Sequence, residues 1–100
     1  MNTRDEWWLA TLGRTIVWAR LRVLEAGTAE VFDSDGNAQP YDSEDSARAA
    51  LMDAEFVALE GMDEDDAAAR DLALGELLPP QATDDAQLRD LMVQKLPQRH

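Results

Sequence analysis

The sequence contains no cysteine, and its single histidine is the last residue, His100. Disulfide bonds, cysteine nucleophiles and cysteine-based zinc sites are therefore excluded. Packing does not orient a histidine at the very end of a chain, so we expect no catalytic or metal-binding role for it. The usual nucleophile–base pairs are thus missing, and we predict a protein that is not an enzyme and needs no cofactor.

Glycine-rich loops and long apolar runs are also missing. The five glycines are dispersed, so no phosphate-binding loop is present. After a start of mixed charge, residues 7–13 form a run of only seven uncharged residues. This run is too short for the apolar part of a signal peptide or for a membrane span. We therefore expect a cytoplasmic protein that does not associate with membranes.

What the sequence does contain is an excess of acidic residues. Twenty-one acidic residues oppose nine basic ones, which gives a formal charge of −12 over 100 residues. Such a chain repels nucleic acid and anionic membranes, so we expect neither as a partner. Three tryptophans and 45% hydrophobic residues nevertheless indicate a folded chain, with residues 1–100 as one small domain. Eight arginines against one lysine, with many alanines, suggest a bacterial source.

Residues 7–41 are predicted to form three or four antiparallel strands. Hydrophobic and polar residues alternate over residues 17–23, which is typical of a strand with two different faces. Turns are expected at Gly13-Arg14, at residues 25–27 and at residues 33–37, where glycine can adopt a positive φ. Pro40 favours an edge strand, since it has no N–H to give to a neighbour. Residues 7–24 can also be drawn as a helix, which leaves an all-α fold as the alternative.

The second half is predicted to be helical. A helix over about 44–59 begins after the capping residues Asp42 and Ser43 and ends at Gly61. A helical extension is expected over about 63–96, with a helical stretch over 67–78 that Gly75 interrupts and Pro79-Pro80 ends. Its final helix, about 84–96, would carry four apolar residues on one side: Leu88, Leu91, Met92 and Leu96. The predicted fold class is therefore α+β: an antiparallel meander of three to four strands, packed by one main helix, with one or two C-terminal helices.

Three side chains are candidates for an interaction surface. Trp18, Arg20 and Arg22 alternate along one predicted strand and therefore share one of its faces. Tryptophan and arginine are enriched at the energetic centres of protein interfaces. We therefore predict an interaction or regulatory module that uses this face or the acidic helices, with a protein partner or by self-association as a homodimer. Aromatic and basic residues on a sheet can also bind nucleic acid, which is the first alternative.

The second alternative is metal binding by carboxylates. Asp33, Asp35, Asn37 and Glu44 have the spacing of the first, third, fifth and twelfth positions of a calcium loop. Ala38 stands where that loop needs glycine, and the preceding segment is predicted as strand, so a turn before a capped helix explains these residues better. The acidic run of residues 63–66 is ordinary at a helix start. We predict no metal site.

Overall fold

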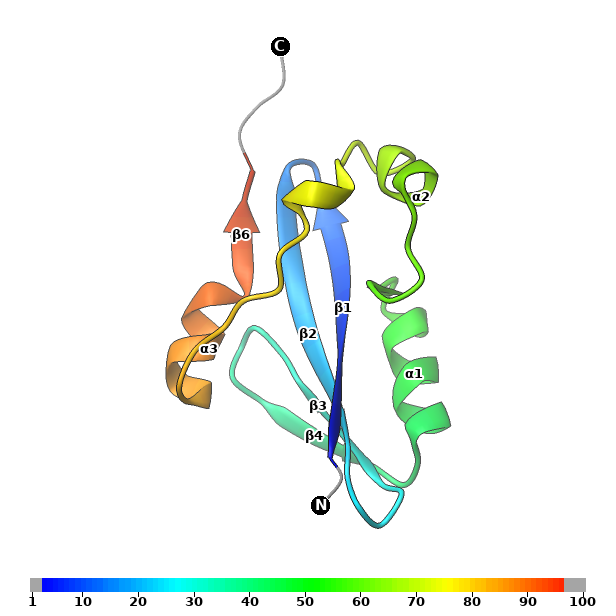
Figure 1. Cartoon of the computed structure of the whole chain (residues 1–100). Helices are drawn as coiled ribbons and strands as arrows, with labels where there is room; N and C mark the ends of the chain where they lie inside the picture. The colour runs from blue at the N-terminus through cyan, green and yellow to red at the C-terminus, as the bar shows by residue number, and fades with distance from the viewer. Residues whose placement is uncertain (1–2, 97–100) are drawn as a thin grey trace.

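The computed structural model describes residues 3–96 and confirms an α+β fold with an antiparallel sheet (Figure 1). The elements follow in the order β1 (Arg4–Leu12), β2 (Thr15–Val23), β3 (Ala29–Phe32), β4 (Ala38–Tyr41), α1 (Glu44–Asp53), β5 (Val57–Ala58), α2 (Glu64–Ala68), a short 3-10 helix η1 (Leu74–Glu76), α3 (Asp85–Leu91) and β6 (Val93–Lys95). Residues 7–24 are thus strands, and the helical alternative is wrong.

β2 is the central strand of the sheet, whose order is β4-β3-β2-β1-β5. β1 pairs with the whole of one edge of β2, from Thr15 to Val23. Two short strands share the other edge: β3 pairs with residues 20–23 and β6 with residues 15–17. Between them, Trp18 donates its backbone N–H to the carbonyl of Met92 at 2.8 Å. The C-terminal part of the chain therefore joins the sheet at its centre.

Both faces of the sheet are covered, each by a different part of the chain. On the face that we call the α1 face, Ala19 and Leu21 pack with Trp8 of β1 against Ala47 and Leu51 of α1. On the opposite face, which we call the C-terminal face, residues of the strands and of the segment after residue 66 form one hydrophobic cluster. The strand residues are Leu9, Ile16, Trp18 and Phe32, and the covering residues are Ala67, Leu72, Leu77, Leu88 and Met92.

The main helix is shorter than the predicted helix over 44–59, because α1 ends at Asp53. Ser43 caps its start, as predicted, by accepting from the backbone N–H of Ser46. At its end Glu55 adopts a left-handed φ of 67°. Phe56 then donates its backbone N–H to Leu51, and Glu55 donates to Met52, which is the hydrogen-bond pattern of a Schellman motif. The chain leaves the helix there and forms β5 at residues where the sequence predicted helix.

A second helix ends in the same way. Asp71 has a φ of 58°, Leu72 donates its N–H to Ala67, and Asp71 donates to Ala68. Leu72 is buried with Ala67 in the cluster on the C-terminal face. The predicted helical extension over 63–96 is less helical than expected, because the stretch predicted over 67–78 is mostly loop. It consists of α2, the short η1 and α3, joined by loops that bring separate leucines onto the sheet.

The predicted last helix over 84–96 is also wrong in its second half. α3 ends at Leu91, and residues 93–95 form β6. Leu88 and Met92 are buried, whereas Leu91 is 45% exposed. The four apolar residues therefore do not share one side of a helix. The orientation of the residues after Leu91 depends on the pairing of β6 with β2 and not on helical periodicity. Figure 1 shows α3 and β6 on one side of the β1–β2 hairpin and α1 on the other.

Replacing Glu55 with glycine should stabilise the protein. A side chain in the left-handed region strains the backbone, and Glu55→Gly should remove a penalty of about 0.5–1 kcal/mol. Urea denaturation measures the free energy of unfolding. Glu55→Ala is the matched control, because alanine keeps the Cβ and should bring no such gain. Equal stabilisation by both substitutions would contradict the assigned helix end.

The division of the last apolar segment can be tested with two neighbouring substitutions. Met92→Ala should lower the free energy of unfolding by about 2–4 kcal/mol, because it leaves a cavity in the cluster on the C-terminal face. Leu91→Ala should cost less than about 1 kcal/mol, because that side chain is partly in solvent. Similar losses for both variants would instead favour one continuous apolar helix side.

Candidate functional site

Two of the three residues of the predicted interaction face, Trp18 and Arg20, lie inside the fold. Trp18 is fully buried, with 0% of its surface exposed. Its indole meets the ring of Trp7 edge-on, with 6.0 Å between the ring centroids, and its Nε1 donates to Oε1 of Gln94 at 2.9 Å. The expectation of an exposed Trp18 is therefore wrong, because leucines and Met92 from the C-terminal segment cover it.

The two arginines of that face are engaged within the chain. Arg20 is 4% exposed; its Nη1 donates to Asp85 at 3.0 Å and its guanidinium stacks over Phe32, 5.0 Å from the ring centroid. Arg22 binds both carboxylate oxygens of Asp5, at 2.7 and 3.1 Å. That hydrogen bonding lowers the pKa of Asp5, against an opposing effect of burial. The structure brings Trp18, Arg20 and Arg22 to one face, as predicted, but buries Trp18 and Arg20 and leaves only the ion-paired Arg22 partly exposed.

The carboxylates of the calcium-like segment serve local structure. Asp33 accepts hydrogen bonds from the backbone N–H groups of Asp35 and Asn37, and so closes the turn between β3 and β4. Glu44 lies in the first turn of α1 and pairs with Arg4 and Arg48. Across residues 3–96, no three acidic or histidine side chains are grouped as a metal site requires.

A buried glutamate that the sequence analysis did not single out lies at the edge of the α1 face. Glu6 is 6% exposed and accepts hydrogen bonds from Arg4, from Arg48 and, at 3.4 Å, from Nε1 of Trp8. Burial by itself raises its pKa, but the hydrogen bonds from Arg48 and Arg4 outweigh that effect, and the pKa of Glu6 ends below its usual value. Glu6 is therefore a charged anchor between β1 and α1.

β5 is an edge strand of the sheet: β1 pairs with one side of it, and no described strand pairs with the other. Leu59 donates its N–H to the carbonyl of Trp7 at 2.9 Å, and Val57 lies opposite Leu9. In an antiparallel pair, residues that hydrogen-bond to the neighbour alternate with residues that do not. The N–H and C=O of Ala58 therefore point away from β1, and none of the described strands lies on that side. Thr11 of β1 lies beyond the end of β5, and its backbone N–H and C=O point toward the same edge of the sheet.

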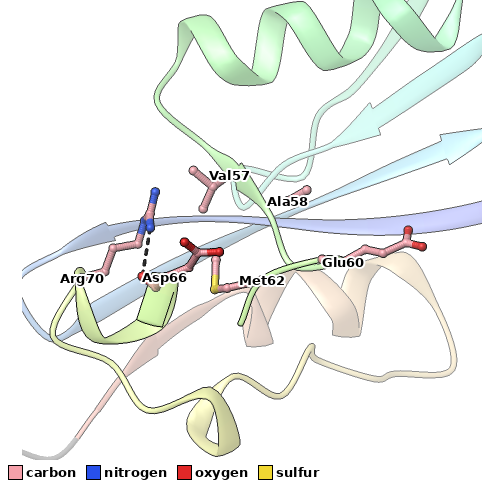
Figure 2. Close-up of a pocket in the computed structure, with 7 residues that line it drawn as sticks. Val57, Ala58, Glu60, Met62, Asp66 and Arg70 are labelled. Atoms are coloured by element: carbon pink, nitrogen blue, oxygen red, sulfur yellow. Dashed lines mark hydrogen bonds between the residues drawn. The ribbon is translucent and has the colours of Figure 1, made fainter. Parts of the chain in front are cut away.

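Two hollows flank this edge and share Ala58 and Glu60. The first, which we call the Met62 hollow, has a volume of about 260 Å³ and is lined by Val57, Ala58, Glu60, Gly61, Met62, Asp66 and Arg70. Figure 2 shows Arg70 and Glu60 at opposite ends of it, with Met62 and Asp66 between. The second, which we call the Trp8 hollow, has a volume of about 380 Å³ and is lined by Arg4, Glu6, Trp8, Arg48, Met52, Ala58 and Glu60.

The β5 edge thus combines unpaired backbone groups with a hollow on each side. An extended peptide can add to such an edge through main-chain hydrogen bonds, while its side chains enter pockets. Sequence reasoning missed this site because β5 has only two residues and follows a helix that was predicted to continue through it. The acidic run of residues 63–66 was the only indication of this region in the sequence.

The ion pairs of Glu6 predict a pH dependence of stability. In the unfolded chain the pKa of Glu6 returns to its ordinary value, so the folded state binds fewer protons than the unfolded state as the pH falls below about 5. The stability that Glu6 contributes is therefore present at neutral pH and is lost on acidification.

Glu6→Gln should lower the free energy of unfolding by about 1–3 kcal/mol at pH 7 and weaken its fall between about pH 5 and pH 3. Urea denaturation across this range measures both effects. Asp53→Asn, at an exposed position at the end of α1, is the control and should change little. A pH profile of Glu6→Gln parallel to that of the parent protein would contradict the assigned role.

None of the described helices is long and apolar enough to cross a membrane. Comparison of the chain with models of protein families, with curated proteins and with solved structures gave no match.

Proposed function

We propose that this chain is a non-enzymatic protein-interaction module that binds a partner at the β5 edge. The observation that carries the proposal is the strand edge at Ala58, which has outward backbone groups and lies between two hollows. The absence of cysteine and the single histidine at position 100 support a binding role rather than catalysis. The predicted partner, a protein or a second copy of the chain, is retained, but its place on the molecule moves from β2 to β5.

The other outer strands support the choice of β5. In β4, Val31 and Gln39 lie opposite each other, and the backbone N–H of Asp33 donates to the carbonyl of Asn37. The alternation that follows directs the nitrogen of Pro40 outward, where it has no hydrogen to offer. The outer side of β6 presents Lys95, and lysine on an edge strand discourages pairing. β5, which consists of Val57 and Ala58, contains neither a proline nor a lysine.

Site-specific crosslinking tests the proposal, and a chain without cysteine allows single thiols to be placed cleanly. Glu60→Cys lies beside β5, and Gln39→Cys on β4 is the matched control at the opposite edge; both positions are exposed. Each variant is labelled with a thiol-reactive photocrosslinker and irradiated in a lysate of the source organism and as pure protein.

We expect covalent adducts several-fold more abundant from position 60 than from position 39, formed either with another protein or with a second copy. The mass of the pure protein by analytical ultracentrifugation distinguishes these two partners. Adducts that are absent, or equally abundant from both positions, would contradict a docking site at β5.

A further inference from the structure

The two hollows beside β5 lie on opposite faces of the sheet. Val57 is opposite Leu9 and packs with the cluster on the C-terminal face, whereas Ala58 is opposite Trp8 and packs with the cluster on the α1 face. Val57 and Met62 place the Met62 hollow mainly on the C-terminal face, and Trp8 places the Trp8 hollow on the α1 face, with Ala58 and Glu60 on the border between them. Side chains of an extended strand alternate between faces. A segment added along β5 would thus place successive side chains in the two hollows.

The Met62 hollow suits a basic side chain. Residues 53–71, which surround β5, contain eight acidic residues and one basic residue, Arg70, and so carry −7 of the total charge of −12. Glu60 and Asp66 line this hollow and form no side-chain ion pair within residues 3–96, although the carboxylate of Asp66 accepts the backbone N–H of Asp63 at the start of α2. Arg70 donates to the backbone carbonyl of Asp66 rather than to its carboxylate. Val57 and Met62 provide an apolar wall for the methylene stem of an arginine or lysine.

The Trp8 hollow suits an apolar side chain. Its two arginines, Arg4 and Arg48, are ion-paired with Glu6 and Glu44, so these four charges cancel, and Glu60, which lines both hollows, adds one carboxylate. Beside these pairs, Met52 is 58% exposed and offers apolar surface to the hollow. The Met62 hollow has a second carboxylate without an ion pair, Asp66, which the Trp8 hollow lacks, and this difference favours the basic side chain in the Met62 hollow.

A second copy of this chain fits the edge poorly. Pairing of two β5 edges would bring residues 53–71 of both copies together, and each copy carries a net charge of −7 in that segment. Like charges that face each other across an interface oppose association. Charge complementarity favours a basic partner instead.

We propose that the β5 edge binds an extended segment of another protein in which basic and apolar residues alternate, by addition of a strand next to Ala58. This proposal rests on the proposed function and specifies its partner. The basic side chains enter the Met62 hollow, the apolar side chains enter the Trp8 hollow, and the N–H and C=O of Ala58 hydrogen-bond to the added strand.

Three synthetic octapeptides test the chemistry of the partner on the full chain labelled with ¹⁵N. One alternates arginine and valine, one alternates glutamate and valine, and one alternates arginine and proline. Amide spectra at low salt report where and how tightly each peptide binds. We expect the arginine–valine peptide to shift the amides of residues 57–62 and to slow hydrogen exchange at Ala58 about tenfold or more. The other two peptides should bind at least about tenfold more weakly.

Two pairs of variants locate the effect. Ala58→Pro removes the outward N–H without removing a hydrogen bond to β1, and should abolish binding of the arginine–valine peptide, whereas Ala38→Pro at the opposite edge should leave it unchanged. Glu60→Gln should weaken binding about threefold or more, whereas Asp35→Asn, the same charge change on the β3–β4 turn, should have a smaller effect.

Several results would overturn the inference. Equal binding of the arginine–proline peptide would exclude strand addition, and equal binding of the glutamate–valine peptide would exclude charge selection. Failure of the arginine–valine peptide to bind, or amide shifts remote from β5, would also refute it. If crosslinking from position 60 succeeds while these peptides fail, the edge is a docking site for a different partner. If both fail, the proposed function fails as well.

Discussion

The structure depends on the burial of β2 on both faces. Alternate residues of this strand enter two separate clusters, Ile16 and Trp18 on one side, Ala19 and Leu21 on the other. Such a strand needs two covering layers, and one helix can supply only one of them. The acidic C-terminal segment supplies the second, and the hydrogen bonds of Trp18 to Met92 and Gln94 hold it against the strand. The positions of α1 and of the C-terminal segment follow from this requirement.

The features that could be predicted from the sequence are those that depend only on neighbouring residues, such as turns and strand alternation. Glycines with positive φ at positions 13, 27 and 36 lie in the three predicted turns, and alternation in residues 17–23 gave the correct strand. The helix ends could not be predicted in the same way, because Glu55 and Asp71 adopt a conformation that glycine usually adopts. Burial of Phe56 and Leu72 next to these ends favours the turn, and that burial depends on the sheet. β6 likewise forms only because β2 offers a free edge.

Prediction of the candidate site from the sequence was limited even more by contacts between distant residues. Sequence periodicity correctly assigned Trp18, Arg20 and Arg22 to one face, because neighbouring residues in a strand decide that property. It could not predict exposure, since the covering residues Leu88 and Met92 lie some seventy positions further along the chain. β5 is too short for any periodicity, and only its pairing with β1 defines it. The acidic character of its surroundings, by contrast, is a matter of composition and could be read directly.

Pro40 has a consequence for assembly as well as for the edge on which it lies. A sheet with two available edges can join copies head to tail without closing, and such contacts generate fibres. Because the outward nitrogen of Pro40 carries no hydrogen, the β5 strand of one copy finds an incomplete ladder on the β4 strand of the next. Growth in that direction stops after a single addition. Pro40 therefore opposes polymerisation through the sheet even if the β5 edge binds a strand, as proposed.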